Sequence, residues 1–464
     1  MTSHSNAPKT KRRKYVHLLQ EFSLPLLAGV IAALILTNVQ PHLYDKMVHG
    51  TYAFFTGEEY QGHGHDAADG DVNAAVGEAE NQGKGAADDE EPKAAGGHGH
   101  GWRHYCTLHF IVNDLFMVIF FGIAAKEITE SCLPGGALNP PSKAINPLLG
   151  TLGGVVGPAG VYILLNLVMG DGTWPWQDGW GRGWGIPTAT DIALAWLIAR
   201  LVFGNNHPAI SFLLLLAVAD DGIGLLIIAF FYPTNDPVWL NLLWLIPGMA
   251  VAYGLRRKNV QSWSPYILIG GAFAWWGLFS AHLHPALALV PIVPFLPGPE
   301  RDEGIFREVA GVHETNPLDR FEHDLKLFVD LGLFFFAFAN AGVEFSSMSN
   351  LTWIVLLALL FGKTIGITGF SWLGVKLGAP LPSGMDLRHL VVAGVVAGLG
   401  LTVALFVAGQ AFEGADQGAS KMGALFSGGI AVLAIVLGRM LGVKDGAGQN
   451  NGAVVEPAAP AKAD

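Results

Sequence analysis

Charged residues are scarce in this chain of 464 residues: only 14% are Asp, Glu, Lys or Arg, against about 25% in a typical soluble domain. This shortage, with a hydrophobic content of 51%, excludes an ordinary soluble globular protein. Cysteine is also rare. Cys106 and Cys132 flank one apolar run of about 25 residues, which as a helix would hold them roughly 35 Å apart. We therefore expect no disulfide between them, and the composition predicts a membrane protein.

Acidic residues are frequent in one stretch only. The formal charge is −11 at pH 7, but residues 57–104 alone hold eleven acidic residues against three basic ones. This stretch and the Gly/Ala/Pro-rich tail beyond Lys444 lack apolar periodicity, so we predict that both are disordered. The histidines of the acidic stretch allow either weak Zn²⁺ or Ni²⁺ binding or a plain solvated loop; they are His63, His65, His98, His100 and His104.

Apolar runs of the length that crosses about 30 Å of hydrocarbon occur twelve times. The run at 283–297 is short and proline-rich, and is marginal as a span. The first run follows a basic cluster and has no cleavage site after it, so we interpret it as a retained helix. The sequence predicts an all-α membrane protein with about twelve transmembrane helices, near 22–39, 107–126, 144–169, 185–203, 209–232, 237–254, 263–282, 283–297, 324–348, 353–377, 387–411 and 422–441.

Lys and Arg residues indicate the orientation of these spans. With the N-terminus in the cytoplasm, twenty of the 27 fall on the cytoplasmic side and six on the outer side, and Lys363 lies within a span. We therefore predict a multi-pass protein of the bacterial cell inner membrane with both termini cytoplasmic, in contact with the lipid bilayer and with no nucleic-acid partner. The predicted regions are a basic N-terminus (1–21), the first helix with its flank (22–56), the acidic periplasmic loop (57–104), the transmembrane bundle (105–443) and a cytoplasmic tail (444–464).

Six ionisable residues fall inside the predicted spans, where each costs on the order of 3 kcal/mol at the bilayer centre unless it is paired or functional. For Asp114 and Asp330, which each stand alone, a structural ion pair is a sufficient explanation. The remaining four are more informative, because two of them are adjacent and one is the only basic residue away from the ends of a span: Asp191, Asp220, Asp221 and Lys363.

The adjacent acids Asp220 and Asp221 point about 100° apart around a helix, so one can face a cavity while the other meets a partner. Their burial and mutual repulsion both favour the protonated form of at least one. A carboxyl group that is protonated at one pH and binds a hard cation at a slightly higher pH makes H⁺ and that cation compete. Such competition is the physical basis of an ion exchanger.

Helix breakers lie near these charges. Pro187 interrupts an apolar run in which Thr188 and Thr190 precede Asp191, and the chain can unwind there and present carbonyl groups. The runs over 144–232 and 353–441 match in length and would enter the membrane from opposite sides, as in an inverted-topology repeat.

The matching position of the second run holds Gly394, Gly398 and Gly400, which indicate either a second interruption or close helix packing. Two broken helices that cross at mid-depth would expose four helix ends. Asp191 and Lys363 have the charges needed to offset them.

These residues resemble the NhaA family of bacterial sodium/proton antiporters. The matching stretches are WGIPTATDIALA (184–195), LAVADDGIGLLIIAFFY (216–232), FFFAFANAGV (334–343), LLFGKTIGI (359–367) and GLGLTVALFVA (398–408), with a weaker match in FIVNDLFMVIFFGI (110–123). Their order along the chain is the order in the family.

The resemblance implies electrogenic exchange, in which more protons enter than Na⁺ or Li⁺ ions leave, for pH and sodium homeostasis. It implies that Asp221 is the principal carrier of Na⁺ and H⁺ and that Asp220 pairs with Lys363. Thr190 and Asp191 match the T-D of the family's broken fourth helix, so transported Na⁺ is expected at Asp221 and Asp191. A homodimer is implied, and neither a cofactor, a structural metal nor an enzymatic activity is expected.

Two departures from the family concern regulation and assembly. Where the family reads GLE-K-RE at the end of its second helix, this chain has Gly122-Ile-Ala-Ala-Lys126-Glu127, which puts the pH response in doubt. The acidic loop replaces a hairpin that can form the dimer contact. His284 resembles a family histidine near the outer face, for which a structural and a pH-sensing role are equally good interpretations.

Two other function classes fit paired membrane acids. An intramembrane aspartyl protease needs two carboxylates from separate helices facing one water; Asp220 and Asp221 diverge on one helix, and no Y-D or G-x-G-D element accompanies them. A Na⁺-coupled solute symporter of similar inverted-repeat fold is the main alternative, although the sequence shows no obvious solute pocket.

Overall fold

The structure is a computed structural model that describes residues 24–50, 107–134, 136, 138–139, 141–204, 207–299 and 316–443. The predictions for the N-terminus (1–21), the acidic loop (57–104), the tail (444–464) and Cys106 lie outside the described residues. The rest of this section concerns the described part of the chain.

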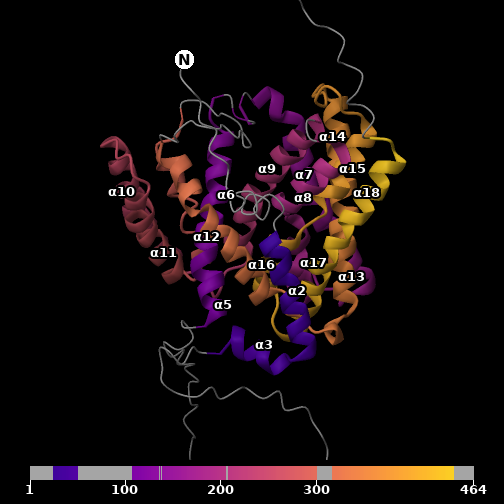
Figure 1. The fold of residues 1–464 in the computed structure, drawn as a ribbon, viewed down its shortest axis with the longest axis horizontal. Helices are drawn as coiled ribbons and strands as arrows, with labels where there is room; N and C mark the ends of the chain where they lie inside the picture. Colours follow the sequence, from indigo (N-terminus) through magenta and orange to yellow (C-terminus); the bar gives the residue numbers. More distant parts are fainter. Residues whose placement is uncertain are drawn as a thin grey trace, which may run out of the picture.

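The described chain is a bundle of helices with no strand in it (Figure 1), which confirms the predicted all-α class. Several helices contain a short 3-10 or π-helical turn. In chain order the elements are α2 (Leu24–Val39), α3 (Pro41–Val48), α5 (Leu108–Phe110), η2 (Ile111–Phe116), α6 (Met117–Ser131), α7 (Pro141–Met169), η3 (Trp180–Thr188), α8 (Ile192–Phe203), α9 (Pro208–Phe231), η4 (Trp239–Trp244), α10 (Leu245–Arg257), η5 (Tyr266–Gly270), α11 (Gly271–Ser280), η6 (Pro285–Leu287), η7 (Val293–Phe295), α12 (Pro317–Asn340), η8 (Phe345–Ser347), α13 (Asn350–Leu357), η9 (Ala358–Gly362), α14 (Lys363–Lys376), α15 (Leu387–Ala397), α16 (Leu401–Ala411), α17 (Gly414–Phe426), η10 (Ser427–Gly429) and α18 (Ile430–Met440).

Five of the described helices are long and apolar enough to cross a membrane, and the number rises to seven if each of two sharply bent helix pairs counts as one span. The predicted count of twelve is therefore not confirmed. The run at 283–297, marginal from its sequence, contains only the short turns η6 and η7, because its prolines interrupt any longer helix. The five are Leu108–Ser131, Ala144–Met169, Pro208–Phe231, Asn350–Lys376 and Gly414–Met440.

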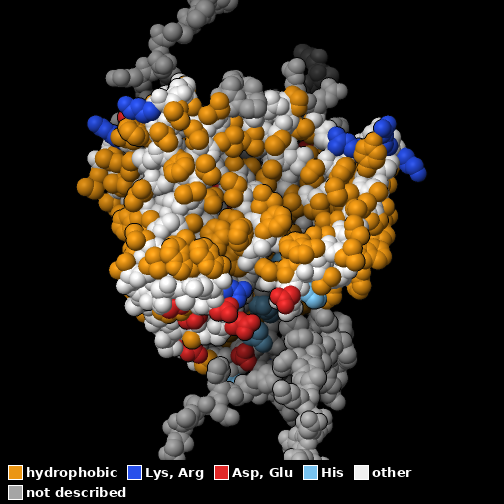
Figure 2. Space-filling view, turned by 180° about the vertical axis from the view of Figure 1, so that it is seen from behind, with side chains coloured by type: hydrophobic (Ala, Val, Ile, Leu, Met, Phe, Trp, Pro, Cys, Tyr) orange, Lys and Arg blue, Asp and Glu red, His pale blue; other side chains and the backbone are white. Residues whose placement is uncertain are grey.

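Hydrophobic side chains form a broad belt across the face of the molecule shown in Figure 2. Many large apolar residues are exposed on these helices, for example Leu164 on α7 and Phe230 on α9, at 60% and 61% of their surface. On the face shown in Figure 2, Lys and Arg side chains gather near one end of the molecule and Asp and Glu side chains near the other. This distribution is that of a membrane protein with different charge at its two ends.

Glycines bring α7 and α14 into close contact. A Cβ atom at Gly366 of α14 would overlap the carbonyl oxygen of Gly153 on α7, and one at Gly157 would overlap the carbonyl oxygen of Gly362. Small residues allow such a backbone approach between membrane helices. The π-helical turn η9 immediately precedes Lys363, so the close contact and the turn together fix where the side chain of that lysine enters the bundle.

Candidate cation and proton site

Two helices of the bundle are broken, as the sequence predicts. The elements η3 and α8 meet at 51° across a break at residues 189–191, and α15 and α16 meet at 48° across a break at residues 398–400. Gly398 and Gly400 lie in the second break. Gly394 lies within α15, where a Cβ atom would come 3.0 Å from the Cα atom of Thr364, so at this position the alternative interpretation, close packing, holds.

The two breaks touch each other. The backbone N–H of Asp191 donates a hydrogen bond to the carbonyl oxygen of Leu399 at 2.6 Å, and the hydroxyl of Thr190 lies 3.0 Å from the carbonyl oxygen of Ala397. A Cβ atom at Gly400 would come 3.0 Å from the carbonyl oxygen of Ala189. The unwound backbone of each broken helix thus satisfies polar groups of the other, which is how non-helical backbone is tolerated inside a membrane bundle.

Charged side chains lie at the helix ends that the two breaks create. Asp191 accepts hydrogen bonds from the backbone N–H of Leu194 at 3.0 Å and of Thr402 at 3.3 Å, so its carboxylate contacts the N-termini of α8 and α16 together. Lys363 donates to the carbonyl oxygen of Thr188 at the C-terminal end of η3. The signs match those expected for an acid near helix N-termini and a lysine near a C-terminus.

Asp220 is bonded to its neighbours through one carboxylate oxygen. Its Oδ2 atom accepts a hydrogen bond from Lys363, with which it forms an ion pair, and lies 2.8 Å from the hydroxyl of Thr190. The exposed fraction is 1% for Asp220 and 0% for Lys363. Further hydrogen bonds support an ion pair this deep, and here Thr188 and Thr190 of the first broken helix provide them. Oδ1 of Asp220 is buried without a partner among the described residues.

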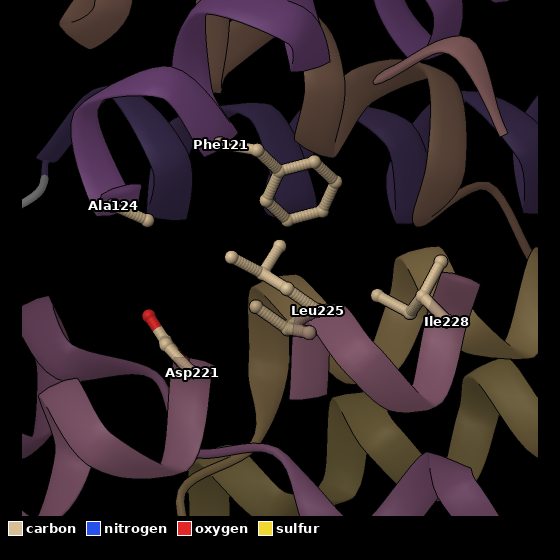
Figure 3. A pocket seen from close by; sticks show the side chains of 6 residues that line it. Phe121, Ala124, Asp221, Leu225 and Ile228 are labelled. Atoms are coloured by element: carbon tan, nitrogen blue, oxygen red, sulfur yellow. The ribbon is translucent and has the colours of Figure 1, made fainter. Parts of the chain in front are cut away.

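Asp221 points in a different direction, toward α6 (Figure 3). Its carboxyl group faces a small cavity lined by Phe121, Ala124, Leu225 and Ile228, with Val403 of α16 completing the lining. The cavity has about 190 Å³ of empty space, its opening included. Within the described chain, Oδ1 of Asp221 is buried and has no hydrogen-bond partner. The two adjacent acids thus diverge as their helical spacing predicts, one toward a lysine and one toward a cavity.

A group of charged residues on α6 and α12 was not identified from the sequence as part of the site. Lys126 forms ion pairs with Glu130, at 2.7 Å, and with Glu322 of α12. Glu127, next to Lys126, lies within electrostatic range of Asp221. The spacing of Lys126 and Glu130, four residues apart on a helix, is a signal that was available, but nothing in the sequence places Glu322 beside them.

The other ionisable residues of the spans lie outside this centre. Asp114 is half-buried in the π-helical turn η2, and Asp330 is half-buried in α12. His284 is buried against the ring of Phe406 and caps η6, accepting the N–H of Ala286. Lys421 is one of the six basic residues that the orientation count places on the outer side. It is buried in α17, which begins at Gly414, before the predicted span 422–441.

The family model described as Na⁺/H⁺ antiporter 1 matches residues 94–441 of this chain. A protein of Geobacter metallireducens named Na(+)/H(+) antiporter NhaA is 52% identical over 438 residues, which cover 93% of this chain and 99% of the relative. A protein of the same name from Desulfitobacterium hafniense is 51% identical over 93% of this chain and 97% of the relative. One from Jannaschia sp. is 43% identical over 91% and 97%, respectively.

These matches cover nearly the whole chain, far more than the motifs from which the resemblance was recognised. The chain is a multi-pass membrane protein and a secondary transporter, not an enzyme, and it belongs to the NhaA family of sodium/proton antiporters.

Proposed function

We propose that this chain exports Na⁺, and Li⁺, across the cell inner membrane in exchange for a larger number of protons, and so serves sodium and pH homeostasis. The observation that carries the proposal is the asymmetry of the adjacent acids. Oδ2 of Asp220 is bonded to Lys363 and Thr190, although its Oδ1 has no partner among the described residues. Asp221 forms no ion pair or hydrogen bond within the described chain, and its carboxyl group faces a cavity. An acid in that position is free to hold either a proton or a cation.

Asp221 is the residue that alternates between H⁺ and Na⁺, and Asp191 supplies a second carboxylate at the crossing of the broken helices. Oxygen atoms of this kind are the ligands that a hard cation prefers. Asp220, Thr190 and Lys363 hold the first broken helix in place, which leaves the transported ion to bind at the neighbouring acid. Because one carboxyl group serves both ions, bound Na⁺ displaces the proton.

The fold that we propose for this exchange has about twelve spans, with inverted repeats over residues 144–232 and 353–441 and the two breaks near the membrane midplane. Both termini lie in the cytoplasm. The separation of basic and acidic side chains toward opposite ends of the molecule supports a fixed orientation (Figure 2). The resemblance also implies a homodimer, which cross-linking in native membranes would test.

A Na⁺-coupled symporter for an organic solute is the alternative from the sequence. Sites for small molecules are usually cavities of about 300–1,000 Å³. The cavity beside Asp221 is far smaller: on a comparable measure it has about 10 Å³, room for about one water molecule, and its lining apart from the aspartate is apolar. Its size favours ions over an organic solute as the cargo.

The test uses everted membrane vesicles with an imposed proton gradient and a fluorescent pH indicator. We expect added Na⁺ or Li⁺ to raise the internal pH in wild-type vesicles and to have no effect in Asp221→Asn. Asp114→Asn is the matched control, because Asp114 is another half-buried acid of a span that lies outside the site, and it should retain exchange. Full exchange in Asp221→Asn would refute the assigned role.

A further inference from the structure

Ser427 connects a third helix to the second break. It is fully buried at the 3-10 turn η10 between α17 and α18, with 0% of its surface exposed. Its hydroxyl donates a hydrogen bond to the carbonyl oxygen of Ala424 at 2.6 Å and accepts one from the backbone N–H of Gly400 at 3.3 Å. The hydroxyl of Ser427 thus donates a hydrogen bond to α17 and accepts one from the break before α16.

The bond to Gly400 acts where backbone donors have few partners. Gly400 is the N-cap of α16 and has no side chain with which to cap the helix, and the first N–H groups of a helix lack partners within it. In a site closed to water, an unpaired N–H is costly. The residue before Gly400 and the second residue after it both contact Asp191: Leu399 through its carbonyl oxygen and Thr402 through its N–H.

Ser427 also matches the acid pair in register. It is the fourteenth residue of the span Gly414–Met440, as Asp221 is the fourteenth of Pro208–Phe231. In the span Pro208–Phe231, Asp220 accepts a hydrogen bond from Thr190 of the first break. In the span Gly414–Met440, Ser427 accepts one from Gly400 of the second break. The same level of two corresponding helices thus supports the two breaks, once with a charge and once with a neutral hydroxyl.

We infer that Ser427 is a positioning residue for the transported cation: through Gly400 it fixes the backbone that orients the carboxylate of Asp191, and so it contributes to the affinity for Na⁺ and Li⁺. This inference rests on the proposed exchange at Asp221 and Asp191. Ser427 itself does not contact the ion, so it acts on apparent affinity more than on the maximal rate.

The experiment compares Ser427→Ala with Ser420→Ala in everted vesicles, with KM and maximal rate measured for Na⁺ and for Li⁺. Ser420 is the matched control: it is equally buried in α17 and donates to the carbonyl oxygen of Gln417 at 3.0 Å, with no bond to α16 among the described contacts. We expect Ser427→Ala to raise KM roughly three- to tenfold for both ions, the effect of about one lost hydrogen bond, while the maximal rate changes little. Ser420→Ala should keep the wild-type KM.

Two more variants cover the case in which Ser427→Ala does not fold. Ser427→Thr retains the hydroxyl and should keep a KM near that of the wild type, whereas Ser427→Cys, with a weak sulfur acceptor, should raise it. A wild-type KM in the folded Ala or Cys variant, or an equal rise in Ser420→Ala, would overturn the inference. Absence of Na⁺-dependent exchange in wild-type vesicles would instead refute the proposed function, so the two failures are distinguishable.

Discussion

Removing the amine of Lys363 should destabilise the protein more than any other single loss of charge in the site. Lys363→Met would leave Asp220, with 1% of its surface exposed, as a buried carboxylate without its counter-ion. It would also remove the donor that reaches the carbonyl oxygen of Thr188. Breaking a buried pair from one side typically costs about 3–5 kcal/mol of the free energy of unfolding, and we expect a loss of this size.

The double variant Asp220→Asn/Lys363→Met should be more stable than Lys363→Met alone. With both charges gone, no unpaired ion is left in the bundle, and replacing a buried ion pair by neutral groups is often close to neutral. The carbonyl oxygen of Thr188 still lacks its donor, so we expect a residual loss of about 1–3 kcal/mol. The second substitution should therefore restore about 1–3 kcal/mol of what the first removed.

The measurement is unfolding of the purified protein in detergent, followed by tryptophan fluorescence. Lys376→Met is the matched control, because Lys376 ends the same helix, where it lies over the ring of Trp372 at 5.4 Å. Its loss should cost less than about 1 kcal/mol. If the double variant is as unstable as the two single losses added together, the side chains are not coupled, and the argument that the ion pair holds the first break is wrong.

Two further predictions concern packing and pH. Gly366→Ala should destabilise the bundle by at least about 1–3 kcal/mol and reduce exchange, because its Cβ atom would overlap the backbone of Gly153. Gly369→Ala on the same helix is the control, since its Cβ atom would meet nothing within 4 Å. It should be neutral or stabilising in the same unfolding assay. At the start of α9, burial and the neighbouring His389 lower the pKa of His207 below its usual 6.5, and Asp386 acts in the opposite direction. Below that pH the unfolded chain binds more protons at His207 than the folded chain does. The free energy of unfolding should therefore fall as the pH decreases from about 6.5. Because Nδ1 of His207 accepts the N–H of Ala209 only when it is unprotonated, His207→Asn, which retains a capping side chain, should show a smaller decrease in melting temperature between pH 7.5 and 5.5; an unchanged pH dependence would refute this assignment.

Local sequence features predict the first break and the divergence of the adjacent acids, and they gave the second break as one of two interpretations. Pro187 cannot continue a helix, Gly398 and Gly400 weaken one, and the 100° step between neighbouring residues sends Asp220 and Asp221 in different directions. These effects act within a few residues. The fold class followed equally well, because apolar runs of this length have few structures available in a bilayer.

Contacts between helices that are far apart in the chain could not be predicted from local sequence patterns. Glu322 meets Lys126 from a residue 196 positions away, and nothing in the local pattern of either helix encodes the meeting. Ser427 was likewise not predicted, because a neutral serine in an apolar span carries no sequence signal for the backbone group that it binds. The number of spans was not confirmed either, because short and proline-rich runs satisfy a hydrophobicity criterion without forming a full helix.

The energetics of the site explain why one acid is left for the ions. The carboxylate of Asp191 is stabilised by two helix N-termini, and that of Asp220 by Lys363 and Thr190. Among the described residues, Asp221 forms no hydrogen bond or ion pair at all. A carboxyl group whose charge is not offset by the protein is stable only when a proton or a cation offsets it. The fixed groups around the breaks therefore hold the fold and also offset the charges of the other acids at the crossing. Asp221 is left as the group at which a proton and a cation can exchange.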